Sequence, residues 1–178
     1  MEKSRLPQLL LLYGDREDTS LTLPLCGLLS RMGGVRYLGF GLAAEYPLAA
    51  SRFLLFETAE LRCCGAEQAL LVLKQGSDYP EGFSPPEHLT VLAQSAKPDW
   101  LAAEDGKQLE WIDLDCGAES TLSLSSLRES RAVLELRRTV TLADGTALEP
   151  GAFPLELHAP AEGFPLLCCC ALRLLGEG

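Results

Sequence analysis

The stretch that decides the fold runs from residue 9 to residue 34 and reads LLLLYGDREDTSLTLPLCGLLSRMGG. Its first five residues are apolar and end at Gly14-Asp15, a pattern typical of a short buried strand. The apolar residues that follow recur at i, i+4, i+7, i+8 and i+11 from Leu21, the spacing of one face of a helix. We expect Thr19 or Ser20 to cap this helix and Gly33-Gly34 to end it.

Further strands are predicted on both sides of a change in pattern near Gly106. Before it, apolar runs predict strands at Val35–Phe40, Arg52–Glu57, Gln68–Lys74 and Leu89–Gln94. After it, strands are expected at Gln108–Asp115, Thr121–Ser125, Ala132–Leu142 and Phe153–His158. Asp144-Gly145 is a favoured pair for a hairpin turn between two of them.

Together these elements predict an α/β fold in a single domain spanning residues 1–178. We expect a mainly parallel N-terminal sheet with flanking helices, continuing into an antiparallel, hairpin-containing C-terminal part. A subdivision near residue 106 would separate a parallel α/β part, 1–105, from a β-rich part, 106–178. The apolar segment from Phe164 to Leu175 is expected either to pack inside the domain or to form the seam of a homodimer.

The composition narrows the class of partner. The chain has 178 residues, 47% of them hydrophobic, and a formal net charge of -10. The apolar content excludes general disorder. The acidic balance argues against nucleic acid and anionic membranes, because both are bound by clustered Lys and Arg. The remaining candidate partners are a small molecule, another protein or a second copy of the chain.

The cysteines and the N-terminus indicate a soluble cytoplasmic protein. The chain has seven cysteines, and five of them stand in the runs Cys63-Cys64 and Cys168–Cys170. Neighbouring cysteines seldom form a disulfide framework, so a reducing compartment is expected. The run Leu9–Leu12 after Lys3 and Arg5 is too short for a signal peptide, and no stretch approaches the roughly 18 apolar residues of a membrane span.

The most polar feature is the turn after the first predicted strand. In open α/β sheets, ligands lie beyond the carboxyl ends of the strands. We therefore take as candidate ligand-binding residues the polar side chains of this turn and the acid that ends the strand at 52–57: Asp15, Arg16, Asp18, Thr19, Ser20 and Glu57. The alternatives are a solvated capping loop, which is favoured, and a metal site made by Asp15 and Asp18.

Other patterns in the sequence give weaker indications of a functional site. The lysines are Lys3, Lys74, Lys97 and Lys107, and none follows a glycine-rich loop, so a standard phosphate-binding loop is excluded. Gly39, Gly41 and Ala44 fit a relaxed dinucleotide pattern with Glu57 as the ribose acid, but Pro47 interrupts the helix that this pattern requires.

For Asp113 and Asp115, which alternate on one strand, a solvated strand face is favoured over a metal or acid–base pair. Buried or unreactive thiols are favoured for Cys63, Cys64 and Cys116, with thiol chemistry at Cys63 or Cys64 as a further possibility. His88 and His158 have no Cys or His at metal-ligand spacing.

No catalytic residue and no metal ligand is assigned, and the cofactor is unknown. The opening of the chain is similar to that of nucleotide-binding α/β domains in general, which is an analogy of fold alone. The sequence favours a non-catalytic protein that binds a ligand or partner. The alternative is an enzyme, or a degenerate nucleotide-binding protein without the phosphate-loop lysine, with its site at the carboxyl ends of the strands.

Overall fold

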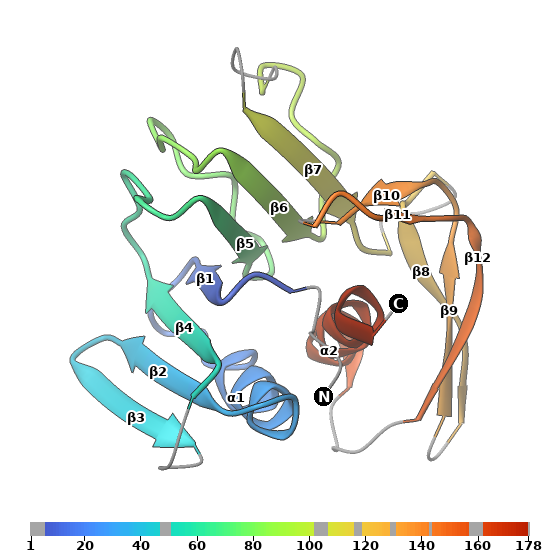
Figure 1. Cartoon of the computed structure of the whole chain (residues 1–178), viewed down its shortest axis with the longest axis horizontal. Coiled ribbons are helices and arrows are strands. Elements are labelled where there is room, and N and C mark those ends of the chain that lie inside the picture. The colour runs from blue at the N-terminus through green and yellow to red at the C-terminus, as the bar shows by residue number, and fades with distance from the viewer. Residues whose placement is uncertain are drawn as a thin grey trace.

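A seven-stranded sheet forms the centre of the computed structural model (Figure 1). The structure describes residues 6–46, 51–101, 107–115, 119–128, 131–142, 144–156 and 162–177. The strands are β1 (Leu9–Tyr13), β2 (Val35–Gly39), β3 (Leu42–Tyr46), β4 (Phe53–Thr58), β5 (Gln68–Leu73), β6 (His88–Ala93) and β7 (Gln108–Asp113). Their order is β3-β2-β4-β1-β5-β6-β7, and every neighbouring pair is parallel except β2 and β3. The prediction of a mainly parallel sheet is confirmed.

The first helix, α1 (Thr22–Arg31), follows β1 as predicted, but it begins differently. Its N-cap residue is Leu21, and no side chain caps it. The expected capping by Thr19 or Ser20 is therefore wrong, because both lie before the cap and are exposed. At the other end, Gly34 donates its N–H to the last helical carbonyls with φ at 87°, a conformation that favours glycine.

The segment considered for a dinucleotide is a hairpin. β2 and β3 pair antiparallel through a two-residue turn, Phe40-Gly41, with Gly39 opposite Leu42. No helix follows Gly41, so the phosphate of a dinucleotide has no helix N-terminus there, and that alternative is wrong. The sequence suggested no strand between 40 and 52, because Leu42–Tyr46 lacks the β-branched residues that usually mark one.

The two faces of the sheet are covered differently. Alternate residues of each strand, such as Leu10, Leu12 and Leu55, face α1 and the C-terminal part in one core. The intervening residues, such as Leu11 and Leu71, pack in a second core against the connecting loops. In the described parts of the chain both helices border the first core, so the second face has loops where a doubly wound fold has helices.

The C-terminal part is antiparallel, as predicted. β8 (Leu122–Arg128), β9 (Arg131–Leu136) and β12 (Gly151–Glu156) form a three-stranded sheet, and β10 (Val140–Thr141) and β11 (Ala147–Leu148) form a hairpin. β7 lies beyond residue 106 yet belongs to the parallel sheet, so the antiparallel part begins only at β8. Helix α2 (Gly163–Glu177) lies between the two sheets (Figure 1).

The apolar C-terminal segment packs inside the chain. Along α2, Cys168, Leu172 and Leu175 are buried in the first core, and α2 contacts α1 and the three-stranded sheet. Of the two roles expected for this segment, the structure shows core packing. No helix in the described residues is long and apolar enough to cross a membrane.

A polar contact joins the two sheets. Arg138 donates to the carbonyl of Trp111 at 2.5 Å and to Thr121 Oγ1 at 2.7 Å, and Thr121 donates to Asp113. Asp113 is 9% exposed, and Asp115 lies outside the strand with φ at 52°. The expected solvated strand face carrying both aspartates is therefore wrong. Cys116 and His158 lie outside the described residues.

Candidate functional site

The strand order places the expected ligand position between β1 and β5. The chain leaves β1 through α1 toward β2 on one side of the sheet, whereas it leaves β5 toward β6 on the other side. A crevice outside the carboxyl ends of two such strands is where open α/β sheets bind ligands. Gly14 follows β1 and Lys74 follows β5, so these two residues border the crevice.

Within the Gly14–Ser20 loop, the candidate carboxylates form hydrogen bonds with the backbone of the loop. Asp15 Oδ1 accepts the backbone N–H of Glu17, and Asp18 Oδ1 accepts that of Ser20, each at 2.9 Å. Partial burial raises the pKa of Asp18, but hydrogen bonds from Ser20 and the charge of Lys74 outweigh it and hold this pKa below its usual value. These contacts are those of Asx turns, which stabilise loops.

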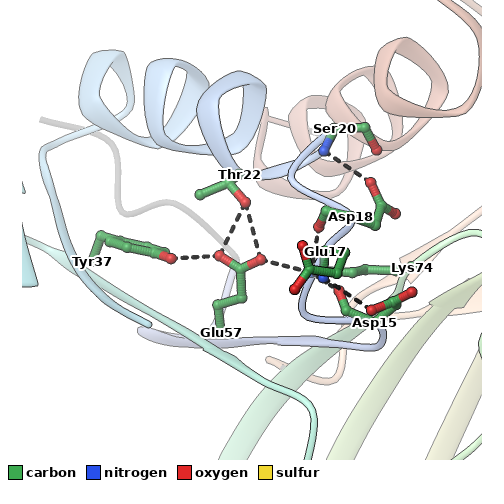
Figure 2. Close-up of polar contacts among 8 residues, drawn as sticks. All are labelled: Asp15, Glu17, Asp18, Ser20, Thr22, Tyr37, Glu57 and Lys74. Carbon is green, nitrogen blue, oxygen red and sulfur yellow. Dashed lines mark hydrogen bonds and ion pairs between the residues drawn. The ribbon is translucent and has the colours of Figure 1, made fainter. Parts of the chain in front are cut away.

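Lys74 occupies the expected ligand position. Its Nζ donates to the backbone carbonyls of Asp15 and Asp18, at 2.6 and 2.5 Å. The same atom forms an ion pair with Glu57 Oε1 at 2.7 Å (Figure 2). An ammonium group has three donors, and these three acceptors match them. The side chains of Lys74 and Glu57 are 0% and 1% exposed, so the pair is shielded from solvent.

Glu57 is the centre of the remaining contacts. Thr22 Oγ1 lies 3.0 Å from both of its oxygens, and the Tyr37 hydroxyl donates to Oε2 at 2.5 Å (Figure 2). Burial and this bond to Glu57 raise the pKa of Tyr37. Burial and the charge of Glu57 raise the pKa of the Cys26 thiol to about 11. Both carboxylate oxygens thus have partners within the chain.

The polarity of the loop is opposite to that of a phosphate site. A phosphate-binding turn directs backbone N–H groups at an anion. Here the carbonyl oxygens of Asp15 and Asp18 are directed at a cation, and that cation belongs to the chain. We name the group formed by Lys74, Glu57, Tyr37, Thr22 and the two carbonyls the Lys74 cluster.

Two glycines make room for the Lys74 cluster. A Cβ on Gly14 would lie 2.7 Å from Lys74 Cβ and against Ser77, and φ there is +147°. A Cβ on Gly39 would lie 2.9 Å from Glu57 Cβ and against the Tyr37 hydroxyl. Because carbon atoms do not approach this closely without strain, larger residues at these positions would push the buried side chains apart.

Phe40 covers the cluster from the hairpin turn. Its ring centroid lies 5.3 Å from Lys74 Nζ and 5.5 Å from the guanidinium carbon of Arg16. Cations at this distance from an aromatic face are attracted to it. Phe40 has φ at 43°, which is unusual for a bulky residue.

The structure therefore brings together only part of the predicted set. Glu57 lies beside the Gly14–Ser20 loop, but Asp15 and Asp18 contribute carbonyls rather than carboxylates to the cluster. Arg16 contacts Phe40, and Thr19 and Ser20 are exposed. Sequence reasoning missed Lys74, Tyr37 and Thr22. The available signal was a single lysine at the end of an otherwise apolar strand, Gln68–Lys74.

The other candidates are not assembled into a site. Cys63 is exposed and Cys64 is partly buried, and His88 Nδ1 lies 3.0 Å from Gln108 Oε1. Within the described ranges, no three His, Cys, Asp or Glu side chains are grouped so that they could hold a metal ion.

Comparison with known proteins gives a likeness of fold. No protein-family model matches the chain, and no curated protein matches it. The chain is similar to the solved structure of a UDP-N-acetylmuramoyl-L-alanyl-D-glutamate--2,6-diaminopimelate ligase, with a TM-score of 0.50 and 11% sequence identity. The match covers 97% of this chain and 43% of the ligase chain, so the chain spans less than half the length of that enzyme.

Proposed function

We propose that the chain is a non-catalytic binding domain with the fold of a nucleotide-binding α/β protein, in which the chain's own lysine occupies the ligand position. The observation that carries the proposal is the Lys74 cluster between β1 and β5. Lys74 Nζ has three acceptors there, and both oxygens of Glu57 have donors.

Opening this cluster to a phosphate is energetically costly. The phosphate would replace Glu57 as the partner of Lys74, and Glu57 would keep only Thr22 and Tyr37. Removing one partner of a buried ion pair typically costs about 3–5 kcal/mol. The carbonyls of Asp15 and Asp18 would also face the incoming anion. A nucleotide therefore gains less at this turn than at a loop that presents N–H groups.

The ligase likeness supports the alternative, an enzyme or a degenerate nucleotide-binding protein. That enzyme is named for a UDP-linked substrate and for 2,6-diaminopimelate. If this chain keeps such an activity, its site would use the same crevice, and Lys74 would leave Glu57 to hold a phosphate.

Thermal unfolding with a ligand panel separates the two functions. The panel contains ATP, GTP, UDP and inorganic phosphate, each with and without Mg²⁺. We expect melting temperatures within about 1 °C of the ligand-free protein. A ligand at 100 times its Kd would add about 2.7 kcal/mol and raise the melting temperature by several degrees.

A matched pair of lysine variants shows whether an increase in melting temperature depends on Lys74. An increase of more than 2 °C that is lost in Lys74→Met and kept in Lys97→Met contradicts the proposal and supports the alternative. Lys97 is exposed and serves as the control.

The same proposal places the chain in the cytoplasm. The six described cysteines are all free thiols, Cys63 at the surface among them. This is consistent with the reducing cytoplasm that the sequence predicts.

A further inference from the structure

The second face of the sheet, which loops cover in the described parts of the chain, contains an aromatic groove. It is lined by aromatic and proline side chains, chiefly Tyr79, Phe83, Trp100, Pro80, Pro85 and Pro86. Its volume is about 150 Å³, the size of a cavity that holds one benzene ring. The groove therefore has room for one side chain of a partner rather than for a whole cofactor.

Tyr79 packs against Phe83 and Trp100 in tilted and edge-on contacts. Tyr79 and Phe83 have centroids 5.9 Å apart and are tilted by 55°, and Tyr79 and Trp100 are 6.1 Å apart at 65°. Trp100 is 65% exposed, unlike Trp111 at 3%. Tyr79 and Phe83 are buried, so Trp100 is the ring of this group that is open to a cation with apolar surface.

The exposed charges that neighbour the groove residues in sequence are mainly negative. Four exposed carboxylates are direct chain neighbours of groove residues: Asp78, Glu81, Glu87 and Asp99. A second hollow shares Pro80 and Gly82 with the groove and is lined by Glu60, Glu81 and one cation, Arg62. Lys107 also lines the groove, but it is already engaged within the chain, and Lys97 is exposed nearby in sequence.

We propose that this groove docks a basic segment of a partner protein through an arginine side chain that packs on the exposed ring of Trp100 at the mouth of the groove. The inference rests on the proposed function, because it names the chemistry of the partner. A planar guanidinium is weakly hydrated and stacks on aromatic faces, and Arg is enriched among residues that dominate interfaces. A second copy of the chain is a poorer occupant, since each copy carries a net charge of -10.

A labelled peptide tests the proposal on the full chain. The probe is Gly-Arg-Gly-Arg-Gly-Arg-Gly, compared with versions in which lysine, citrulline or glutamate replaces arginine. Citrulline keeps the shape of arginine without its charge, and lysine keeps the charge without the planar group. Fluorescence anisotropy measures binding, and a change in tryptophan emission that is lost in Trp100→Ala reports contact at the groove.

The expected order of affinity is arginine, then lysine, with citrulline and glutamate at least tenfold weaker than arginine. Trp100→Ala is expected to weaken arginine-peptide binding at least tenfold, and Leu127→Ala, an exposed leucine on β8, to leave it unchanged. Asp99→Asn with Glu81→Gln is expected to weaken it severalfold, while Glu156→Gln on β12 does not.

The proposal is overturned by citrulline binding as well as arginine, by unchanged binding in Trp100→Ala, or by no binding at 5 mM peptide. These results leave the proposed function intact as long as the nucleotide panel gives no shift. A nucleotide shift that depends on Lys74 contradicts the proposed function whatever the peptide does.

Discussion

The Lys74 cluster and the aromatic groove lie on the same sheet, and they differ in whether their side chains remain available to a partner molecule. In the Lys74 cluster the side chains are buried, and the donors and acceptors described for Lys74 and Glu57 are matched inside the chain. In the groove, Trp100 is 65% exposed and the neighbouring carboxylates are at the surface.

This difference shows that position in the fold does not decide function by itself. The Lys74 cluster occupies the place where α/β sheets bind ligands, yet its groups bind one another. The groove lies on the opposite side from the helices, where loops cover the sheet. Substitutions in the Lys74 cluster should therefore change stability, whereas surface substitutions in the groove should change binding.

The largest effect is expected for Lys74→Met. It leaves Glu57 as a buried charge without its cation, and such changes cost about 3–5 kcal/mol of unfolding free energy. Urea denaturation followed by circular dichroism measures it. Lys97→Met should stay within about 0.5 kcal/mol. Adding Glu57→Gln should recover part of the loss, and a loss below about 1 kcal/mol in the single variant would mean that the pair is solvated.

The second-largest effect is expected from alkaline pH, which should lower the free energy of unfolding. The pKa values of Cys26, at about 11, and of Tyr37 are both raised in the folded chain. The stability that these groups contribute is complete below their unfolded pKa values, about 8.5 and 10. It is lost as pH rises toward the folded values.

Unfolding free energy should accordingly be level up to about pH 8 and fall above about pH 9. The fall is at most about 1.4 kcal/mol per pH unit for each group. The buried thiols of α2, whose pKa values are also raised by burial, add to it. Urea midpoints under a reductant between pH 7 and 11 measure the slope. Cys26→Ala should reduce it and Cys63→Ala should not, and equal slopes in all three proteins would refute the prediction.

Gly39→Ala and Gly14→Ala should each cost about 1–3 kcal/mol, because their Cβ atoms overlap members of the cluster. Gly27→Ala is the matched control. Nothing lies within 4 Å of a Cβ there, and alanine in a helix stabilises it by up to about 1 kcal/mol. Thermal unfolding gives the three differences, and a stable Gly39→Ala would show that Tyr37 can move away from Glu57.

The smallest effect is expected at Phe40. Phe40→Ala removes the ring from Lys74 and Arg16 and should cost about 1 kcal/mol. Phe40→Asn should cost less, since Asn-Gly is the favoured pair for such a turn. Urea denaturation distinguishes these small differences. An Asn variant more stable than the native chain would show that the ring contributes less than its strain costs.

The sequence predicted the strands well because their apolar runs are continuous and bounded by turns. The runs at 9–13, 53–56 and 69–73 became β1, β4 and β5. It did not predict β3, whose two alanines carry little signal, nor that loops rather than helices cover the second face in the described residues. Both follow from pairing across the chain rather than from local pattern.

The sequence predicted where the candidate site lies but not all of the residues that form it. Glu57 and the Gly14–Ser20 loop do lie together, because β1 and β4 are neighbours. Lys74 was missed because the lysines were tested only for the phosphate-loop spacing. A lysine buried at a strand end is recognisable as a partner only once the strand beside it is known. β1 lies 60 positions earlier in the chain, in the register that pairs Leu11 with Leu71 and Tyr13 with Leu73.

The position of α2 has a consequence for synthesis. During translation the strands of both sheets leave the ribosome before the helix that fills the space between them. At about 5–20 residues per second, Leu10 and Leu12 wait on the order of 10 s for Cys168 and Leu172 to be made. Through that interval the main core lacks one side, and a nascent chain stopped before residue 163 should be the form that chaperones hold.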